Sequence, residues 1–408
     1  MNKRTSTITS IALFSGLALG AQVSTPRVGG LAQIWYTQML DSNLRHFDSQ
    51  STGFRNANFQ NMTQFKENSF SIKRIDLKVD GKISDNVDYY VNIDPTISSG
   101  AVLQDVFIKY KMPHKIELMV GQFKPFQTFD GFIPPADALF AEYTQLANLF
   151  SGRERGAWLS MGFGSPQTIN GRFHVGMTNG YGKNNDLNSQ KDIVARLDLN
   201  YGKHHYFGGY ALHGSTDQPD TGSLKAIQFQ GTSVPSDETI LDNKDKTSHY
   251  GIFYNFRSDK VYASAEVMTG LWGRRFFPSV YAGATAPPSL RAHLDQAFLS
   301  YVGVFAYNIN NRHKVLARYD YMDYNYGDKW YTVQNPYVIP AGTLAGDYTP
   351  KFTEVTLGYT FALLHDSQKA ANIKANYVMR SKNFLYPRSG QSGEQGGDSI
   401  VIALQVAF

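Results

Sequence analysis

The stretch Arg74-Ile75-Asp76-Leu77-Lys78-Val79-Asp80-Gly81-Lys82-Ile83 alternates strictly between two kinds of residue. Counting from Ile75, every odd position is apolar or glycine, and every even position is charged. Because successive side chains of a β-strand point to opposite faces, this pattern predicts a strand with one apolar and one charged face. Such a strand can meet lipid on one side and water on the other.

Similar alternation continues to the end of the chain and predicts about sixteen strands. Their expected ranges are 31–40, 70–83, 87–94, 103–112, 115–123, 155–163, 170–178, 191–201, 205–215, 247–257, 260–272, 296–309, 313–326, 351–362, 369–381 and 398–408. Short turns and long connections alternate between them. This arrangement is typical of bacterial outer-membrane barrels, whose two ends face different compartments. We therefore expect an all-β, 16-stranded antiparallel transmembrane β-barrel.

The third long connection, about 124–154, is expected to fold inward. A barrel of this strand number otherwise leaves a wide aqueous channel, which an inward loop would constrict. Within it, apolar residues from Asp137 to Phe150 recur at near-helical spacing. That spacing predicts a short helix packed against the inner wall.

The start of the chain has the pattern of a secretory signal peptide. Lys3 and Arg4 precede an apolar run from Ile8 to Leu19 and then a small-residue segment ending at Ala21. We expect residues 1–21 to be a signal peptide and 22–408 to form one barrel domain in the bacterial outer membrane. A transmembrane anchor, the alternative, needs about twenty apolar residues.

Composition excludes several classes of function. The net charge of +5 falls to +3 without the two basic residues of the signal segment, which is too mild for a nucleic-acid partner. The chain has no cysteine, which excludes disulfides and thiolate metal sites. We expect no metal and no cofactor, since passive diffusion needs neither.

Three other interpretations remain open. A soluble β-sandwich or propeller could also contain many strands, although no blade motif repeats at a fixed period. An outer-membrane enzyme is possible in principle, because a Ser-His constellation on neighbouring strands leaves no local motif. A receptor or adhesin role could reside in long connections such as Thr216 to Lys246 or Gly327 to Pro350.

The last residues resemble the signal that the outer-membrane assembly machinery reads. Apolar residues occupy alternate positions from Ile400 to the final Phe408. The resemblance implies that this machinery is a partner, besides outer-membrane lipid and lipopolysaccharide.

The segment Gly121-Gln122-Phe123-Lys124-Pro125 follows an alternating strand and resembles the phosphate-selective porin O and P family. The resemblance is densest from Phe70 to Met161, although Phe126 stands where the family usually has a second proline. It implies a homotrimeric outer-membrane channel in which inward-facing Arg and Lys side chains guide anions. Small hydrophilic solutes, with anions such as phosphate among them, would diffuse through it.

Candidate channel residues follow from this resemblance and from the alternation. Lys124 matches the lysine of the family motif, and Arg74 lies where the family places wall arginines. The candidate anion contacts are Arg74, Lys78, Lys109, Lys124, Arg153 and Arg155. The acids expected to oppose them are Asp130, Asp137 and Glu142 in the loop, and Asp105 on the wall. Other inward cations expected from the alternation include Arg196, Arg318 and Lys374.

Overall fold

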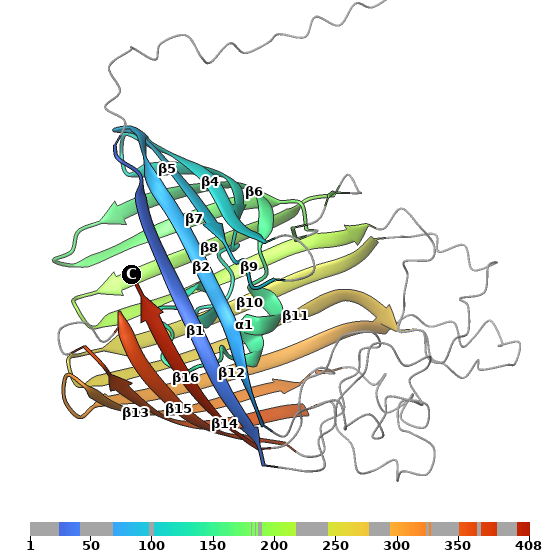
Figure 1. Cartoon of the computed structure of the whole chain (residues 1–408). Coiled ribbons are helices and arrows are strands. Elements are labelled where there is room, and N and C mark those ends of the chain that lie inside the picture. Colours follow the sequence, from blue (N-terminus) through green and yellow to red (C-terminus); the bar gives the residue numbers. More distant parts are fainter. Residues whose placement is uncertain are drawn as a thin grey trace, which may run out of the picture.

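The computed structural model describes residues 24–40, 68–97, 102–180, 182–183, 185–186, 190–217, 244–276, 294–323, 326–327, 351–364, 369–381 and 398–408. Sixteen antiparallel strands pair in chain order and close into a barrel, with β1 beside β16 (Figure 1). Each expected strand is present, with ends shifted by a few residues.

The strands are β1 (Arg27–Met39), β2 (Asn68–Ser84), β3 (Val87–Ile93), β4 (Leu103–Met112), β5 (Ile116–Phe123), β6 (Glu154–Gly164), β7 (Ile169–Thr178), β8 (Asp192–Tyr201), β9 (His205–Asp217), β10 (Lys244–Arg257), β11 (Val261–Phe276), β12 (Leu294–Asn308), β13 (His313–Asp323), β14 (Lys351–Ala362), β15 (Ala371–Arg380) and β16 (Ser399–Ala407). In the described part of the chain, no helix is long and apolar enough to cross a membrane.

Burial across the wall is the reverse of that in a soluble protein. The apolar side chains of Ile108, Val120 and Ile252 are more than half exposed on the outside. Charged residues such as Arg196 and Asp320 are buried. A soluble protein buries apolar side chains and exposes most charged ones, whereas a barrel with an outer apolar band and a polar interior shows the distribution seen here.

The barrel closes where Phe408 meets Gly30 on β1. The Phe408 N–H donates to the Gly30 carbonyl at 3.1 Å, and the Gly30 N–H donates to the Phe408 carbonyl at 2.8 Å. The Phe408 ring occupies the space of a side chain at position 30, since a Cβ there would lie 2.3 Å from a ring carbon. Glycine at this position therefore allows the last residue to seal the seam.

A bulge in β2 alters which residues face the interior. Gln33 on β1 is opposite Arg74, but the next residue, Ile34, is opposite Ile72, so Lys73 is an extra residue in β2. Strict alternation would place Lys73 outside. Instead its Nζ lies 4.4 Å from the centre of the Trp35 ring, on the inner side, because a bulge re-aims a side chain.

The helix expected over 137–150 forms only in part. The structure has a 3-10 turn, η3 (Asp130–Phe132), and a short helix, α1 (Gln145–Phe150), whose N-cap Thr144 accepts from the Ala147 N–H. Before α1, the Ala138 carbonyl and the Ala141 N–H bond to wall side chains instead. These backbone groups are thus not available for helical hydrogen bonds, which periodicity alone did not reveal.

Candidate functional site

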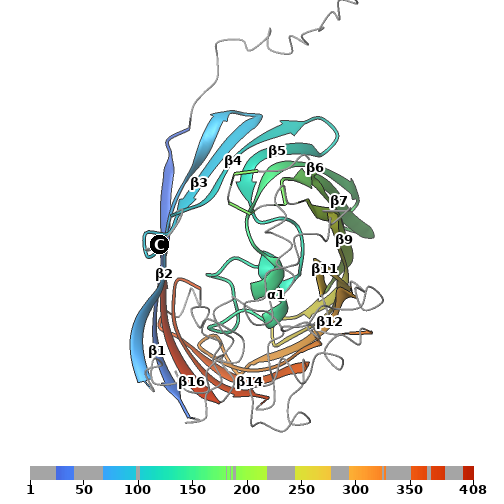
Figure 2. The ribbon, with the colours of Figure 1, turned by 90° about the vertical axis from the view of Figure 1, so that its right-hand side faces the viewer.

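Residues 124–153, called the loop segment below, lie within the ring of strands, where Figure 2 shows α1 inside the barrel. Wall side chains on the far side bond to the backbone of the segment. The Glu266 carboxylate on β11 accepts from the Phe129 N–H at 2.6 Å. Other wall residues that bond to its backbone are Gln33, Arg196, Arg318, Asp320, Lys374, Asn376 and Gln405. The loop segment is therefore anchored to six strands, β1, β8, β11, β13, β15 and β16.

This anchoring occupies three of the inward cations expected from the sequence. Arg196, Arg318 and Lys374 are buried, and each donates to a backbone carbonyl of the loop segment at 2.6–3.1 Å. A buried cation held in this way satisfies the backbone and is removed from solvent. These three residues thus position the loop segment rather than face a passing solute.

Aromatic contacts hold both ends of the loop segment. Near its start, the Phe126 ring stacks on His174 at 4.3 Å and meets Trp158 edge-on at 4.4 Å. Near its end, Phe150 stacks on Phe298 of β12 at 4.7 Å. Phe126, which departs from the family motif, is thus part of the packing that fixes the loop segment to β6 and β7.

Gly121 of the motif allows β4 and β5 to approach closely. Its φ is +146°, and a Cβ there would lie 2.1 Å from the Val106 carbonyl oxygen and 2.7 Å from the Phe107 Cα. Only glycine adopts this conformation without a clash. The chain reaches Lys124 three residues later, so this glycine helps to place the start of the loop segment.

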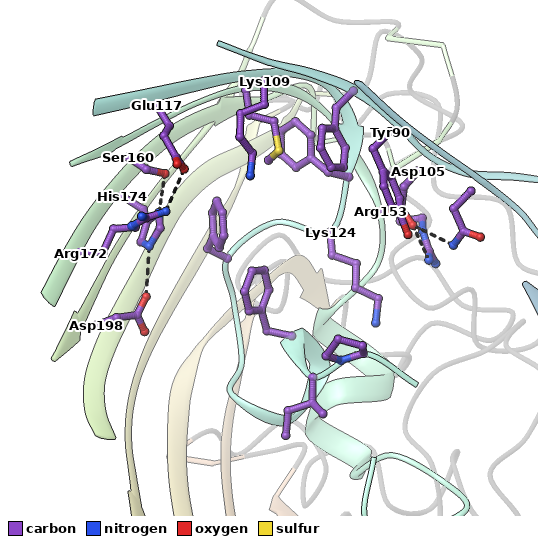
Figure 3. Close-up of a pocket in the computed structure, with 18 of the residues that line it drawn as sticks. Tyr90, Asp105, Lys109, Glu117, Lys124, Arg153, Ser160, Arg172, His174 and Asp198 are labelled. Carbon is purple, nitrogen blue, oxygen red and sulfur yellow. Dashed lines mark hydrogen bonds and ion pairs between the residues drawn. The ribbon is translucent and has the colours of Figure 1, made fainter. Parts of the chain in front are cut away.

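Beside the loop segment lies a cavity of about 550 Å³, called the passage below (Figure 3). One side is formed by inward residues of the β2–β9 wall and the other by the loop segment. The wall contributes Asp76, Lys78, Tyr90, Asp105, Phe107, Lys109, Glu117 and Arg172, and the loop segment contributes Lys124, Phe126, Phe132, Ile133, Pro134, Pro135 and Arg153.

Two ion pairs neutralise charges in the passage. Arg153 binds Asp105 with two parallel contacts, Nε to Oδ1 and Nη2 to Oδ2, both 3.0 Å long. Arg172 binds Glu117 at 2.8 Å. Two arginines and two acids of the passage are therefore bound to each other and are not available to bind a solute.

Three lysines of the passage lack such a match. Within the residues that the structure describes, Lys78, Lys109 and Lys124 form no ion pair within 4.0 Å. Figure 3 shows Lys109 between the Glu117–Arg172 pair and the Arg153–Asp105 pair. Asp76 also lines the passage, but only 3% of its surface is exposed. The accessible charge that remains is positive.

The acids of the loop segment do not line the passage. Asp130 accepts from the Thr144 N–H at 2.9 Å within the loop segment itself. Asp137 pairs with Lys369 at 2.6 Å, and Glu142 pairs with Lys73 at 2.9 Å. Asp130 is thus bound within the loop segment, whereas Asp137 and Glu142 are paired with lysines elsewhere in the barrel.

Lys124 is half-buried at the base of the loop segment. Its Nζ donates to the Gly131 carbonyl at 2.8 Å and lies 5.0 Å from the centre of the Tyr143 ring. Burial lowers the pKa of Lys124 to about 8, and the positive charges of Arg153 and Arg74 act in the same direction. Its charge therefore changes near neutral pH.

Arg155, by contrast, lies on the outer face of the barrel. It is one residue out of phase with Trp158 and Ser160, which face inward, and its Nε donates to Gln122 Oε1 at 3.2 Å. It borders an outer groove with apolar Val120 and Met177. The expectation that Arg155 contacts the solute does not fit this position. The alternation of inward and outward residues along β6 already indicated that Arg155 faces outward.

Ser160, His174 and Asp198 form a chain across β6, β7 and β8 at the side of the passage. Ser160 Oγ lies 2.7 Å from His174 Nδ1, and His174 Nε2 lies 3.2 Å from Asp198 Oδ2. The three residue types are those of a hydrolytic triad, with the two imidazole nitrogens exchanged, since a triad serine bonds to Nε2 and the aspartate to Nδ1. However, Phe126 covers the imidazole, and the strand N–H groups that could form an oxyanion hole are paired in the sheet. Among the described residues, no cluster of acids and histidines could hold a metal ion.

The sequence interpretation missed several residues of the passage. Arg172 lies on the polar face of an expected strand, so alternation could have identified it as an inward residue. Tyr90, Phe107 and Phe132 gave no such signal, because aromatic residues in barrels are usually assigned to the outer girdles.

Comparison with solved structures finds the same architecture at low sequence identity. The trimer form of OmpT from Vibrio cholerae is 10% identical, with 94% of this chain and 99% of that chain covered and a TM-score of 0.54. The anion-selective porin from Comamonas acidovorans is also 10% identical, with 94% and 99% covered and a TM-score of 0.52. OprB from Pseudomonas putida is 9% identical, with 94% of each chain covered and a TM-score of 0.54. At 9–10% sequence identity, these similarities establish the fold alone.

No curated protein matches the chain in sequence. The model of the family described as phosphate-selective porin O and P matches residues 50–325, which is more than half of the chain. The closed barrel of sixteen strands, its polar interior and this match together show a passive outer-membrane channel that belongs to the phosphate-selective porin O and P family.

Proposed function

We propose that the channel admits small hydrophilic solutes with a preference for anions, and that the loop segment narrows it to the passage. The observation that supports this preference is the trio of lysines, Lys78, Lys109 and Lys124, without ion-pair partners in the described structure. A positive charge in a narrow channel raises the local concentration of anions.

Electrical recording tests this proposal. Protein reconstituted in a planar bilayer should give stepwise conductance and, under a KCl gradient, a reversal potential of the sign expected for chloride. The triple variant K78Q/K109Q/K124Q should lose most of that potential. Arg155→Gln is the matched control, because it removes a basic residue from the outer face. Cation selectivity of the unaltered channel would contradict the proposal.

The assembly proposed is a homotrimer inserted with its short turns on the periplasmic side. Support comes from the trimer form of a barrel of the same fold, and the proposal predicts conductance steps in groups of three. Removal of a signal peptide, residues 1–21, and contact with the assembly machinery, lipid and lipopolysaccharide are part of the same proposal. Residues 1–23 lie outside the described residues, as do most of the loops considered for a receptor role.

A channel without enzymatic activity is favoured over a barrel hydrolase. The arrangement of Ser160, His174 and Asp198 is the one observation that favours an enzyme. Asp198 is also bound by Arg196, with Nε–Oδ distances of 2.9 and 3.1 Å, so it serves the network that anchors the loop segment. We assign Ser160, His174 and Asp198 a structural role in the wall.

A further inference from the structure

The two sides of the passage differ in character. Between Lys124 and Arg153, the loop segment borders the passage with the run Phe132-Ile133-Pro134-Pro135, which has no polar side chain. The Phe132 side chain is 41% exposed, although it belongs to a segment inside the barrel. Its ring packs on Phe126, with ring centres 4.8 Å apart, and lies 5.4 Å from the Arg196 guanidinium. These contacts fix the ring in place and leave its remaining surface open to the passage.

The opposite wall places a pair of rings between charged residues. Along the inward face of β4, Asp105, Phe107 and Lys109 follow one another at alternate positions, about 7 Å apart. Phe107 stacks on Tyr90 of β3 with ring centres 5.0 Å apart. A solute that moves along this wall meets the Arg153–Asp105 pair, then the aromatic pair, and then Lys109, which forms no ion pair with any residue that the structure describes.

This order is unsuited to compact inorganic phosphate. Phosphate binding sites use several cationic donors, above all arginines that bind two oxygens at once. Both arginines of the passage, Arg153 and Arg172, are already paired with carboxylates. The strip between Phe107 and Phe132 offers mainly ring faces and aliphatic carbon to a strongly hydrated ion.

We infer that the passage prefers carboxylates that carry a flat apolar group over compact inorganic anions. The carboxylate would contact Lys109, and its apolar body would lie between the Tyr90–Phe107 pair and Phe132. This inference rests on the proposed anion preference and specifies the class of anion. Aromatic contacts of this kind contribute affinity for one apolar face without a covalent step.

Permeability ratios measured with benzoate, acetate and phosphate test the inference. Acetate has the same charged group as benzoate and is smaller, so it isolates the contribution of the ring. We expect benzoate to permeate better than acetate and to block the chloride current at lower concentration than phosphate. Phe132→Ser and Tyr90→Leu should each lower the benzoate-to-acetate ratio about three-fold. Phe305→Leu, at a 48% exposed apolar position, is the matched control.

The outcomes separate this inference from the proposed function. Lys109→Gln should reduce the permeability of all anions alike, whereas the aromatic variants should leave the chloride-to-potassium ratio unchanged. An anion-selective channel that admits acetate better than benzoate, or that phosphate blocks more strongly than benzoate, overturns the inference alone. A cation-selective channel overturns both. Circular dichroism establishes that each variant is folded before it is compared.

Discussion

Arg153 and Asp105 form a two-point ion pair, with both nitrogen–oxygen distances at 3.0 Å, at the side of the passage. The pair joins the end of the loop segment to β4, and both side chains are less than a quarter exposed. The sequence indicated Arg153 as an anion contact and Asp105 as an acid that opposes it. In the structure their two charges neutralise each other. The field of the passage is therefore set by the charges that remain unpaired.

Breaking this pair should shift ion selectivity in opposite directions. Asp105→Asn frees the Arg153 charge and should raise the anion-to-cation permeability ratio about two-fold, whereas Arg153→Gln exposes a carboxylate and should lower it by a similar factor. The double variant should return close to the original ratio. Reversal potentials in a KCl gradient measure all three, and equal shifts in the same direction would contradict the pairing.

Selectivity should also depend on pH through Lys124. Because burial lowers its pKa to about 8, with further contributions from Arg153 and Arg74, the side chain loses its charge as pH rises through that value. The anion preference should therefore fall between pH 7 and 9. Lys124→Gln should remove this step, while Lys124→Arg should keep the preference at high pH. Persistence of the step in the glutamine variant would assign it to another group.

The loop segment should become mobile when its anchors are removed. Glu266 accepts from the Phe129 N–H at 2.6 Å and from the Tyr210 hydroxyl at 2.7 Å. Glu266→Ala leaves these donors unsatisfied, at a cost of about 1–3 kcal/mol. Single-channel records should show higher conductance and more noise. Glu266→Gln keeps an acceptor and should behave nearly as the original channel does; identical records for the alanine variant would show that the anchor is dispensable.

Gly121 should be far less tolerant of substitution than a glycine in open surroundings. Gly121→Ala forces an unfavourable φ and a clash with the Val106 carbonyl, which together should cost roughly 2–4 kcal/mol. Gly303→Ala is the matched control, because a Cβ there meets no atom within 4 Å. Thermal unfolding in detergent should show a lower midpoint for the first variant only.

Ser160 should not act as a nucleophile. Purified protein treated with a fluorophosphonate probe should remain unlabelled at Ser160, because Phe126 covers the adjacent imidazole. Ser160→Ala should conduct as the original does. Stoichiometric labelling at Ser160 that is lost in His174→Ala would instead establish a hydrolytic site.

The architecture was predictable from the sequence because it depends on local alternation. A strand whose residues alternate as they do from Ile75 to Ile83 has only one orientation in a membrane wall, and the spacing of turns then fixes the order of strands. The family motif from Gly121 to Pro125 also marks a local requirement, namely close strand approach at Gly121.

The passage depended on tertiary structure. The sequence determined which residues are charged and, for most strands, which face they occupy. It did not determine that Arg318 and Lys374 hold the loop segment or that Phe132 borders the lumen. It also did not determine that Glu142 pairs with Lys73, the extra residue of the bulge in β2. These partners are far apart in the chain, and only the closed barrel brings them together. The pairing of charges through space therefore decides which lysines remain available to a solute.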